Sequence, residues 1–237
     1  MTRYIKNISE IDYEFVISDA WDIVEFDLTL NEDKLAEYLQ TIINDFNEYR
    51  FDFNAKEYLN DATYNRYLAE NKVTNYVGDI TGWTLSWPIE RDIPIPSQVH
   101  ANLEIYPELK TSNLYYDSKL MDKYNFGYMT TLHDALSVKF LRQMIITKHS
   151  PGVKTLTHVD GERKKIHIPL QSDKEAIFHF GPNGEREYTM DVGKIYMINP
   201  SVHHGTINRG TLDRYHLISR VDFDFISQVL AMKGKLE

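Results

Sequence analysis

The chain has 237 residues, of which 42% are hydrophobic and 26% are charged, proportions that are typical of a folded globular protein and exclude wholesale disorder. Its net charge of −9 argues against nucleic acid as a partner, because a protein that binds nucleic acid needs a basic surface. The absence of cysteine excludes disulfide scaffolds, thiolate metal sites and cysteine nucleophiles. No apolar run approaches the ~18–20 residues that span a bilayer, and the first residues lack the apolar region of a signal peptide, so we expect a cytoplasmic protein with no membrane partner.

The first clear element in chain order is a helix that begins after Asn31. The Asn31 side chain can cap the helix, and two acidic residues then suit the positive end of its dipole. Apolar residues follow at helical spacing and predict one buried face, formed by Leu35, Leu39, Ile42, Ile43 and Phe46. Prolines and scattered aromatic residues interrupt the stretch 50–130, so we expect loops, short strands and a short helix near 118–124 there.

Strand signals dominate from Phe140 onward. Two turn segments, 181–184 and 209–213, each lie between two strand candidates and predict two β-hairpins. Many short strands at near-regular spacing are typical of a sandwich, jelly roll or barrel. The strands are expected at Phe140–Lys148, Lys165–Leu170, Ile177–Phe180, Arg186–Met190, Lys194–Asn199, His204–Asn208 and Arg214–Val221, before a final helix from about Phe223 to Met232.

We therefore interpret residues 1–237 as a single domain, since the chain shows no internal repeat and no linker-like segment. Residues 1–135 form a covering region rich in helix and loop, and residues 136–222 form the catalytic core. Residues 223–237 form a C-terminal helix. The covering region is expected to lie over the mouth of the core and to shape a substrate pocket.

The candidate metal ligands are His158, Asp160 and His204. Residues i and i+2 of a strand face the same side, so His158 and Asp160 can present an imidazole and a carboxylate to one point. A third ligand, His204, must then arrive from another strand. Two histidines and one carboxylate on one face of a metal form the facial triad of non-haem Fe(II) oxygenases. His203 is the alternative to His204, and strand alternation favours His204.

Arg214 follows the last histidine by ten residues. If residues 204–214 form a hairpin, His204 and Arg214 lie roughly opposite each other, with Cβ atoms ~5 Å apart. A guanidinium group binds a carboxylate through two hydrogen bonds. A five-carbon diacid that chelates iron at one end would place its far carboxylate at Arg214.

Residues of about 140–222 resemble the aspartyl/asparaginyl β-hydroxylase-like family of Fe(II)/2-oxoglutarate-dependent dioxygenases, and are similar in layout to bacterial proline hydroxylases. The resemblance covers about a third of the chain. It implies a mainly β fold with flanking helices, a double-stranded β-helix of the jelly-roll, cupin-like kind. The matching segments are Ser150-Pro151-Gly152, His158-Val159-Asp160, Lys165 to Leu170, Gly193 to Asn199, His204 to Asn208, and Arg214 to Leu217.

The resemblance also implies roles for individual residues. His158, Asp160 and His204 would hold Fe(II), and Arg214 would bind the distal carboxylate of 2-oxoglutarate. Thr147, Lys165 and His167 are further candidates for the co-substrate pocket. Lys165 stands where the family often has arginine, so a point charge replaces a bidentate contact. The run from Gly161 to Lys165 is interpreted as a solvated loop or, alternatively, as a basic segment that attracts an anionic substrate.

These observations predict an Fe(II)- and 2-oxoglutarate-dependent dioxygenase, a hydroxylase, with dioxygen as the second co-substrate. Its substrate is expected to be an amino acid, an aspartyl or asparaginyl side chain in a peptide, or a related small molecule. The alternative is a non-redox, cupin-like protein, either a metal-dependent isomerase or lyase or a small-molecule binding barrel. Such a protein has no need of Arg214 at its position.

Overall fold

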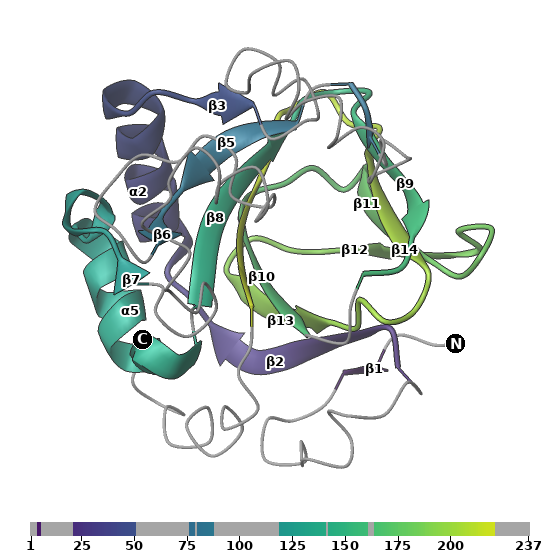
Figure 1. Ribbon diagram of the computed structural model, residues 1–237, viewed down its shortest axis with the longest axis horizontal. Coiled ribbons are helices and arrows are strands. Elements are labelled where there is room, and N and C mark those ends of the chain that lie inside the picture. Colours follow the sequence, from purple (N-terminus) through teal and green to yellow (C-terminus); the bar gives the residue numbers. More distant parts are fainter. Residues whose placement is uncertain are drawn as a thin grey trace, which may run out of the picture.

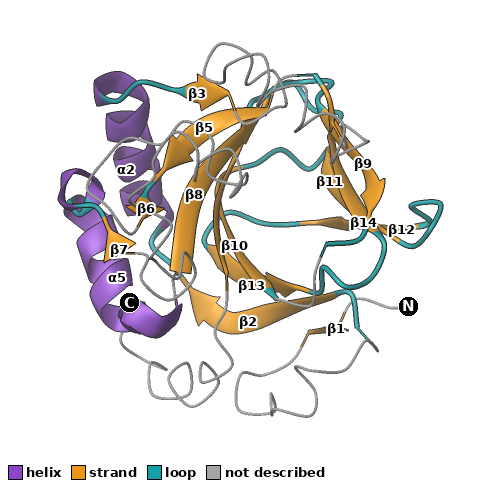
Figure 2. Ribbon diagram, in the orientation of Figure 1, coloured by secondary structure: helices purple, strands orange, loops and turns teal. Residues whose placement is uncertain are grey.

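The computed structural model describes residues 4–5, 21–50, 76–78, 80–87, 119–140, 142–160 and 164–220. Within these residues, two β-sheets face each other, and two helices lie outside the larger sheet (Figures 1 and 2). The predicted final helix from Phe223 lies outside the described residues.

Eight consecutive strands form the core of this architecture. They are β8 (Arg142–His149), β9 (Lys154–His158), β10 (Lys165–Gln171), β11 (Ala176–Phe180), β12 (Arg186–Thr189), β13 (Lys194–Ile198), β14 (His204–Asn208) and β15 (Arg214–Arg220). They pair as nested antiparallel partners: β8 with β15, β9 with β14, β10 with β13, and β11 with β12. The chain thus behaves as one long hairpin, which is rolled so that β10 also pairs with β15 and β11 with β14. This winding confirms the predicted double-stranded β-helix.

Shorter strands widen both sheets. The larger sheet has the order β1-β2-β13-β10-β15-β8-β5-β3 and the smaller one the order β12-β11-β14-β9-β4. β6 and β7 form a separate two-stranded sheet. The added strands are β1 (Tyr4–Ile5), β2 (Ile23–Thr29), β3 (Tyr49–Arg50), β4 (Tyr76–Val77), β5 (Ile80–Thr84), β6 (Ser86–Trp87) and β7 (Lys119–Leu120).

The predicted first helix is confirmed as α2 (Glu32–Asp45), with Asn31 Oδ1 accepting a hydrogen bond from the Lys34 amide as its N-cap. Its buried residues, which include Leu35, Leu39 and Ile42, pack with the outer face of the larger sheet. One detail of the prediction is wrong: Ile43 is exposed, because it lies at the edge of the apolar face. The expected short helix near 118–124 is the 3₁₀ helix η4 (Asp122–Tyr124).

A second long helix, α5 (Gly127–Phe140), was not predicted. Its apolar residues do not gather on one face, so the periodicity that reveals α2 is absent. The strand expected from Phe140 consequently begins later, as β8 at Arg142. No helix in the described part of the chain is long and apolar enough to cross a membrane.

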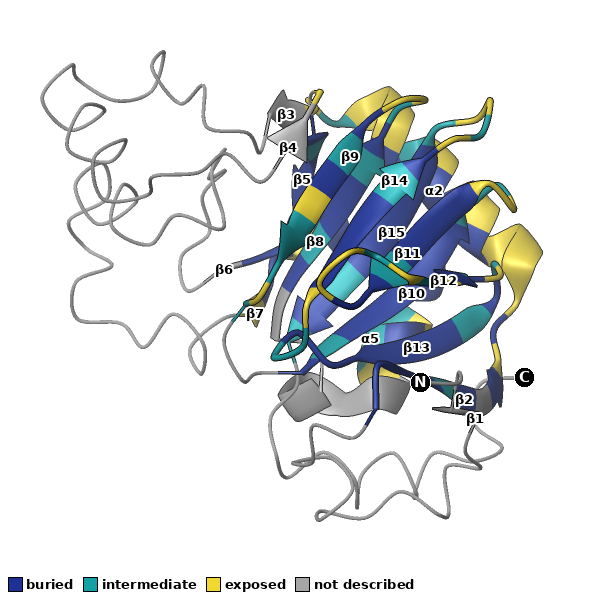
Figure 3. Cartoon of the chain, turned by 90° about the vertical axis from the view of Figure 1, so that its right-hand side faces the viewer, coloured by how far each residue is buried: buried dark blue, intermediate teal, exposed yellow. Residues whose placement is uncertain are grey.

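Two apolar clusters hold these layers together. The larger one joins α2 and α5 to the outer face of the large sheet, with Ile146, Ile166, Ile168 and Leu217 among its members. The smaller one lies between the two sheets, where Phe178 and Phe180 of β11 meet Tyr196 and Ile198 of β13. Figure 3 shows the strands largely buried, with exposed residues mainly in the loops and on the helices. Polar side chains adjoin this cluster, since His167 and His216 pack against Phe178.

One predicted hairpin is confirmed and the other is wrong. β11 and β12 pair around the turn 181–184, where Gly181 and Gly184 have the positive φ angles that favour glycine. β14 and β15, in contrast, do not pair. β14 lies between β9 and β11 in the small sheet, and β15 lies between β8 and β10 in the large one. The segment 209–213 therefore crosses from one sheet to the other.

Candidate metal centre and anion site

Two histidines face each other across the ladder that joins β9 and β14. His158 and His204 are directly opposed in the antiparallel register, at a point where the register then shifts. Directly opposed side chains have Cβ atoms ~4.5–5.5 Å apart, and the two imidazole ring centres lie 4.5 Å apart. Irregularities of this kind re-aim side chains and are common next to active sites. Sheet pairing thus brings together two residues that are far apart in sequence.

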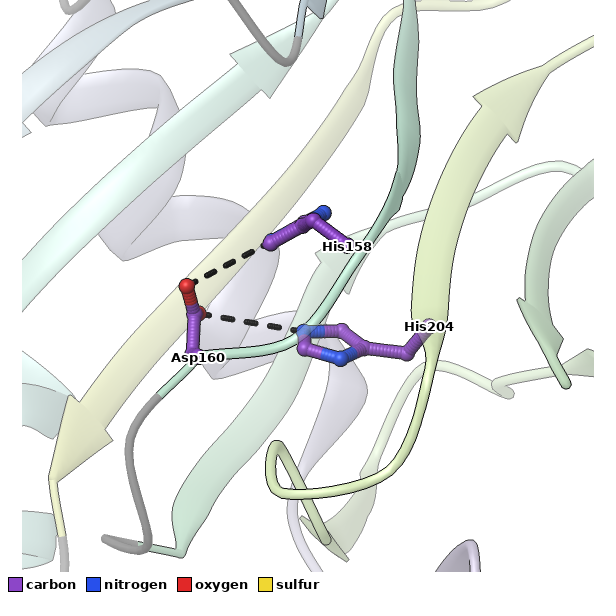
Figure 4. Close-up of side chains that lie close together, drawn as sticks. All are labelled: His158, Asp160 and His204. Atoms are coloured by element: carbon purple, nitrogen blue, oxygen red, sulfur yellow. Dashed lines mark ion pairs between the residues drawn. The ribbon is translucent and has the colours of Figure 1, made fainter. Parts of the chain in front are cut away.

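Asp160 completes the cluster from beyond the end of β9. Its Oδ1 lies 3.5 Å from His158 Nε2, and its Oδ2 lies 3.8 Å from His204 Nε2 (Figure 4). One ligand atom from each of the three residues lies within 4.8 Å of the other two. The reasoning from strand alternation needs a correction here, because β9 ends at His158. Asp160 is positioned instead by its backbone amide, which donates to the Pro200 carbonyl oxygen at 2.9 Å.

Backbone hydrogen bonds set the tautomer of both histidines. His158 Nδ1 lies 2.7 Å from the Leu156 carbonyl oxygen, and His204 Nδ1 lies 2.9 Å from the Val202 carbonyl oxygen. A carbonyl oxygen can only accept, so Nδ1 carries the proton in each ring. In the neutral ring the lone pair is then on Nε2, the atom that faces Asp160. This is the arrangement in which histidine binds metals.

The charges of the cluster suit a cation. Burial, together with the positive charges of Lys165 and His158, lowers the pKa of His204 to about 4, so its ring is neutral at physiological pH. Burial by itself would raise the pKa of the Asp160 carboxyl, but the neighbouring His158 and the Lys165 ammonium hold it well below its usual range. Two imidazoles, of which that of His204 is neutral, and one carboxylate therefore meet at one point.

Lys165 lies at this cluster and not beside Arg214. Its ammonium group forms an ion pair and hydrogen bond with Asp160 Oδ2. Lys164, its neighbour, is 4% exposed and donates to Asn199 Oδ1 at 2.6 Å. The interpretation of this segment as a solvated run is therefore wrong at Lys164. Residues 161–163 lie outside the described part of the chain.

Arg214 is a buried cation inside the barrel. It is 2% exposed, its guanidinium lies 4.9 Å from the centre of the Phe178 ring, and Nη2 donates to His216 Nδ1 at 3.0 Å. Burial lowers its pKa to about 9, which leaves it protonated at neutral pH. Among the described residues it has no carboxylate partner, and its Nε–H is buried without a hydrogen bond. Buried charges are normally paired, so Arg214 is a candidate for holding an anion.

The metal cluster and Arg214 face the same space, although not through the predicted hairpin. Arg214 is opposite His149 in the register, because β15 pairs with β8. The connection runs through β11: the His204 ring packs 6.2 Å from Phe180, and the Arg214 guanidinium packs on Phe178. Positions two apart on a strand share a face and are separated by ~6.6 Å.

Three further buried polar groups on the larger sheet have no hydrogen-bond partner among the described residues. They are Thr147 Oγ1, both ring nitrogens of His167, and His216 Nε2. Thr147 and His216 are opposite each other in the register of β8 and β15. The structure thus places the predicted Thr147 and His167 on the strands that flank Arg214.

The analysis of the sequence did not single out His216 or His149, which are both buried. A signal was present in the sequence: His216 is two residues after Arg214, and His149 is two residues after Thr147, so each shares a strand face with a residue that was identified.

Comparison with known proteins points in the same direction as this geometry. The sequence model of a family described as aspartyl/asparaginyl beta-hydroxylase matches residues 120–223, which confirms the resemblance over the eight core strands. Comparison with curated protein sequences gives no match.

Several solved structures are similar to the chain at low identity. One is an oxidoreductase of the 2OG-Fe(II) oxygenase family from Burkholderia pseudomallei, at 13% identity and a TM-score of 0.46 over 93% of this chain and 95% of that chain. Another is a predicted oxalate decarboxylase from Thermotoga maritima, at 15% identity and a TM-score of 0.32 over 62% and 83% of the two chains. A third is a Cupin 2 conserved barrel domain protein from Salinispora arenicola, at 14% identity and a TM-score of 0.28 over 37% and 69%.

Proposed function

We propose that this protein is an Fe(II)- and 2-oxoglutarate-dependent oxygenase that hydroxylates an amino acid, an aspartyl or asparaginyl side chain, or a related small molecule. The observation that carries the proposal is a combination. A cluster of two histidines and one carboxylate shares the barrel interior with a buried arginine that has no anionic partner among the described residues. The family match over residues 120–223 supports the same reading.

The donor set fits the proposed metal. His158 and His204 would offer Nε2 and Asp160 a carboxylate oxygen, the 2-His-1-carboxylate set that leaves positions open on Fe(II). Bound iron would supply the activation of dioxygen that couples conversion of 2-oxoglutarate to succinate and CO₂ with hydroxylation of a C–H bond. The protein's part is to bind, orient and keep out water.

Arg214 fits the distal carboxylate of the co-substrate. Its Nε–H is an unused donor in a site where little water competes, and a guanidinium group recognises a carboxylate with directional hydrogen bonds. The non-redox alternative, a cupin-like isomerase, lyase or binding barrel, gives this buried cation no partner. Arg214 is therefore the residue that favours the oxygenase over the alternative.

Asp160 also bears on the outcome of the reaction. Iron oxygenases that halogenate lack the carboxylate ligand, which leaves a coordination position for chloride. With Fe(II) bound, the Asp160 carboxylate would fill that position, and its negative charge would disfavour chloride there. We infer that the native outcome is hydroxylation, with one 2-oxoglutarate consumed per product.

The test begins with anaerobic binding of Fe(II) and 2-oxoglutarate by the full chain, followed by a succinate-release screen over free amino acids and peptides. Each substrate that releases succinate is then incubated with the enzyme, oxygen and chloride, and the product mass is measured. A gain of one oxygen supports the proposal, and Asp160→Gly is expected to lose most of that product while gaining weak chloride binding. Succinate release that is independent of Fe(II), a chlorinated product, or no binding of 2-oxoglutarate by the metal-loaded protein would contradict the proposal.

A further inference from the structure

His216 is a buried histidine whose proton can be located. It lies on β15, two residues from Arg214 and on the same face of the strand, and it is fully buried. Arg214 Nη2 lies 3.0 Å from His216 Nδ1. A guanidinium group has donors only, so Nδ1 must be the acceptor of this hydrogen bond. In a neutral ring the proton is then on Nε2.

The ring is neutral under ordinary conditions. Burial, together with the nearby charges of Arg214, His167 and His149, lowers the pKa of His216 well below its usual value. The ring therefore presents a fixed Nε2–H donor. Its neighbours in the register are Thr147 on β8 and Pro169 on β10.

The hydrogen bond between Arg214 and His216 uses one nitrogen of each side chain and leaves a second N–H group on each without an acceptor in the described part of the chain. Arg214 Nε–H and His216 Nε2–H are both buried and have no partner among the described residues. The Thr147 hydroxyl, in the position opposite His216, is unused as well. Burying a donor without an acceptor is unfavourable, so a set of this kind indicates a ligand that supplies acceptors.

We propose that His216 is a co-substrate-binding residue: its Nε2–H donates to the distal carboxylate of 2-oxoglutarate, while its Nδ1 holds the Arg214 guanidinium in place. The distal carboxylate is then recognised by an arginine–histidine pair and not by the arginine alone. This inference rests on the proposed function, because it assigns a further contact to the same co-substrate. It makes His216 a determinant of selectivity for dicarboxylic over monocarboxylic 2-oxo acids.

The experiment compares two ligands that differ only at the far end. 2-Oxoglutarate has the distal carboxylate, and 2-oxopentanoate has a methyl group in its place. Their affinities for the Fe(II)-loaded protein are measured anaerobically by calorimetry and by the absorption of the iron–2-oxo-acid chelate. The variants are His216→Phe, which removes both nitrogens, and His216→Gln, which keeps one acceptor and one donor. His133→Phe, on α5, is the matched control for the same substitution outside the barrel.

We expect His216→Phe to weaken 2-oxoglutarate binding about 10- to 100-fold, the usual effect of losing a hydrogen bond to a charged group. Binding of 2-oxopentanoate should change less than about threefold, and His216→Gln should recover most of the lost affinity for 2-oxoglutarate. Equal losses for both ligands would show a structural role and overturn the inference, as would unchanged selectivity. Failure of the wild-type protein to bind 2-oxoglutarate at all would instead count against the proposed function.

A measurement on the wild-type protein covers the case in which His216→Phe does not fold. Nitrogen-15 NMR of labelled histidine, with Zn(II) in place of Fe(II) and His216→Gln to assign the signal, reports which ring nitrogen is protonated. The inference predicts an Nε2-protonated ring whose signal shifts with 2-oxoglutarate and stays in place with 2-oxopentanoate. An Nδ1-protonated ring, or equal shifts with the two ligands, would overturn it.

Discussion

Replacing Arg214 with methionine should make the ligand-free protein more stable while it removes tight binding of 2-oxoglutarate. The guanidinium is 2% exposed, and within the described residues no carboxylate compensates its charge. Methionine has a similar length and no charge, so it can fill the space without a desolvation penalty. Higher stability combined with lost binding is the result expected for a residue that serves binding at a cost in stability.

The size of the effect follows from the burial of the charge. Burial lowers the pKa of Arg214 from its usual 12.5 to about 9. At 1.36 kcal/mol per pH unit, this corresponds to a destabilisation of the charged side chain of roughly 5 kcal/mol. The hydrogen bond to His216 and the contact with the Phe178 ring, which the variant loses, offset roughly 2–3 kcal/mol of it.

The net expectation is a gain of about 2–3 kcal/mol in the free energy of unfolding of the ligand-free Arg214→Met protein. In a chain of this size the melting temperature rises roughly 2–4 °C per kcal/mol. Binding of 2-oxoglutarate to the metal-loaded variant should weaken by ~2–5 kcal/mol, because the carboxylate is left buried and unpaired.

The assay is calorimetric melting of wild type and variant, each with and without 2-oxoglutarate, under anaerobic conditions. Arg209→Met is the matched control, since Arg209 is a partly exposed arginine in an ion pair with Glu187, and its melting temperature should change little. If the ligand-free Arg214→Met protein melts below the wild type, the guanidinium is already compensated without a ligand and the reasoning is refuted. An undiminished stabilisation of the variant by 2-oxoglutarate would refute the assignment of the anion site.

Three further predictions concern the metal ligands, the buried histidines and the helix cap. His204→Ala should abolish Fe(II)-dependent succinate release while leaving the circular dichroism spectrum unchanged; residual iron-dependent turnover would remove His204 from the ligand set. Burial keeps the pKa values of His149, His167 and His216 well below 6.5, so the unfolded chain binds more protons than the folded one just below pH 6.5. Their contribution to stability is complete above about pH 6.5 and is lost as the pH falls, so urea unfolding should show lower stability at pH 5.5 than at pH 7.5; equal stabilities would contradict this. Asn31→Ala should cost about 1 kcal/mol in the same unfolding assay and Asn31→Asp much less, and equal losses would argue against the cap.

Local sequence was sufficient for the elements whose residues encode them directly. Asn31 and the spacing of Leu35, Leu39 and Ile42 specify α2, because capping and helical periodicity are properties of a few neighbouring residues. The glycines of the turn 181–184 specify the β11–β12 hairpin for the same reason. Residue type and spacing also identified the two histidines and the aspartate that the structure brings together.

Tertiary structure decided the choice of strand partners. Residues 209–213 have the composition of a hairpin turn, yet β14 and β15 join different sheets. Pairing with β9 and β11 on one side, and with β8 and β10 on the other, satisfies four strand edges, whereas a local hairpin would satisfy only one pair. This choice depends on strands far away in the sequence, so it cannot be predicted from the residues of the turn.

The site depends on the same non-local pairing. His158 and His204 meet because β9 and β14 are in register, and Asp160 reaches them from beyond the end of β9, where its amide donates to the Pro200 carbonyl oxygen. His216 carried no distinctive motif, and only its burial next to Arg214 shows that its proton is fixed and unused. Amino-acid types and spacing are local quantities, and they determined which groups this chain can offer. Pairing between distant strands decides which of those groups are buried, which find a partner and which are left without one. This pairing exists only in the folded protein.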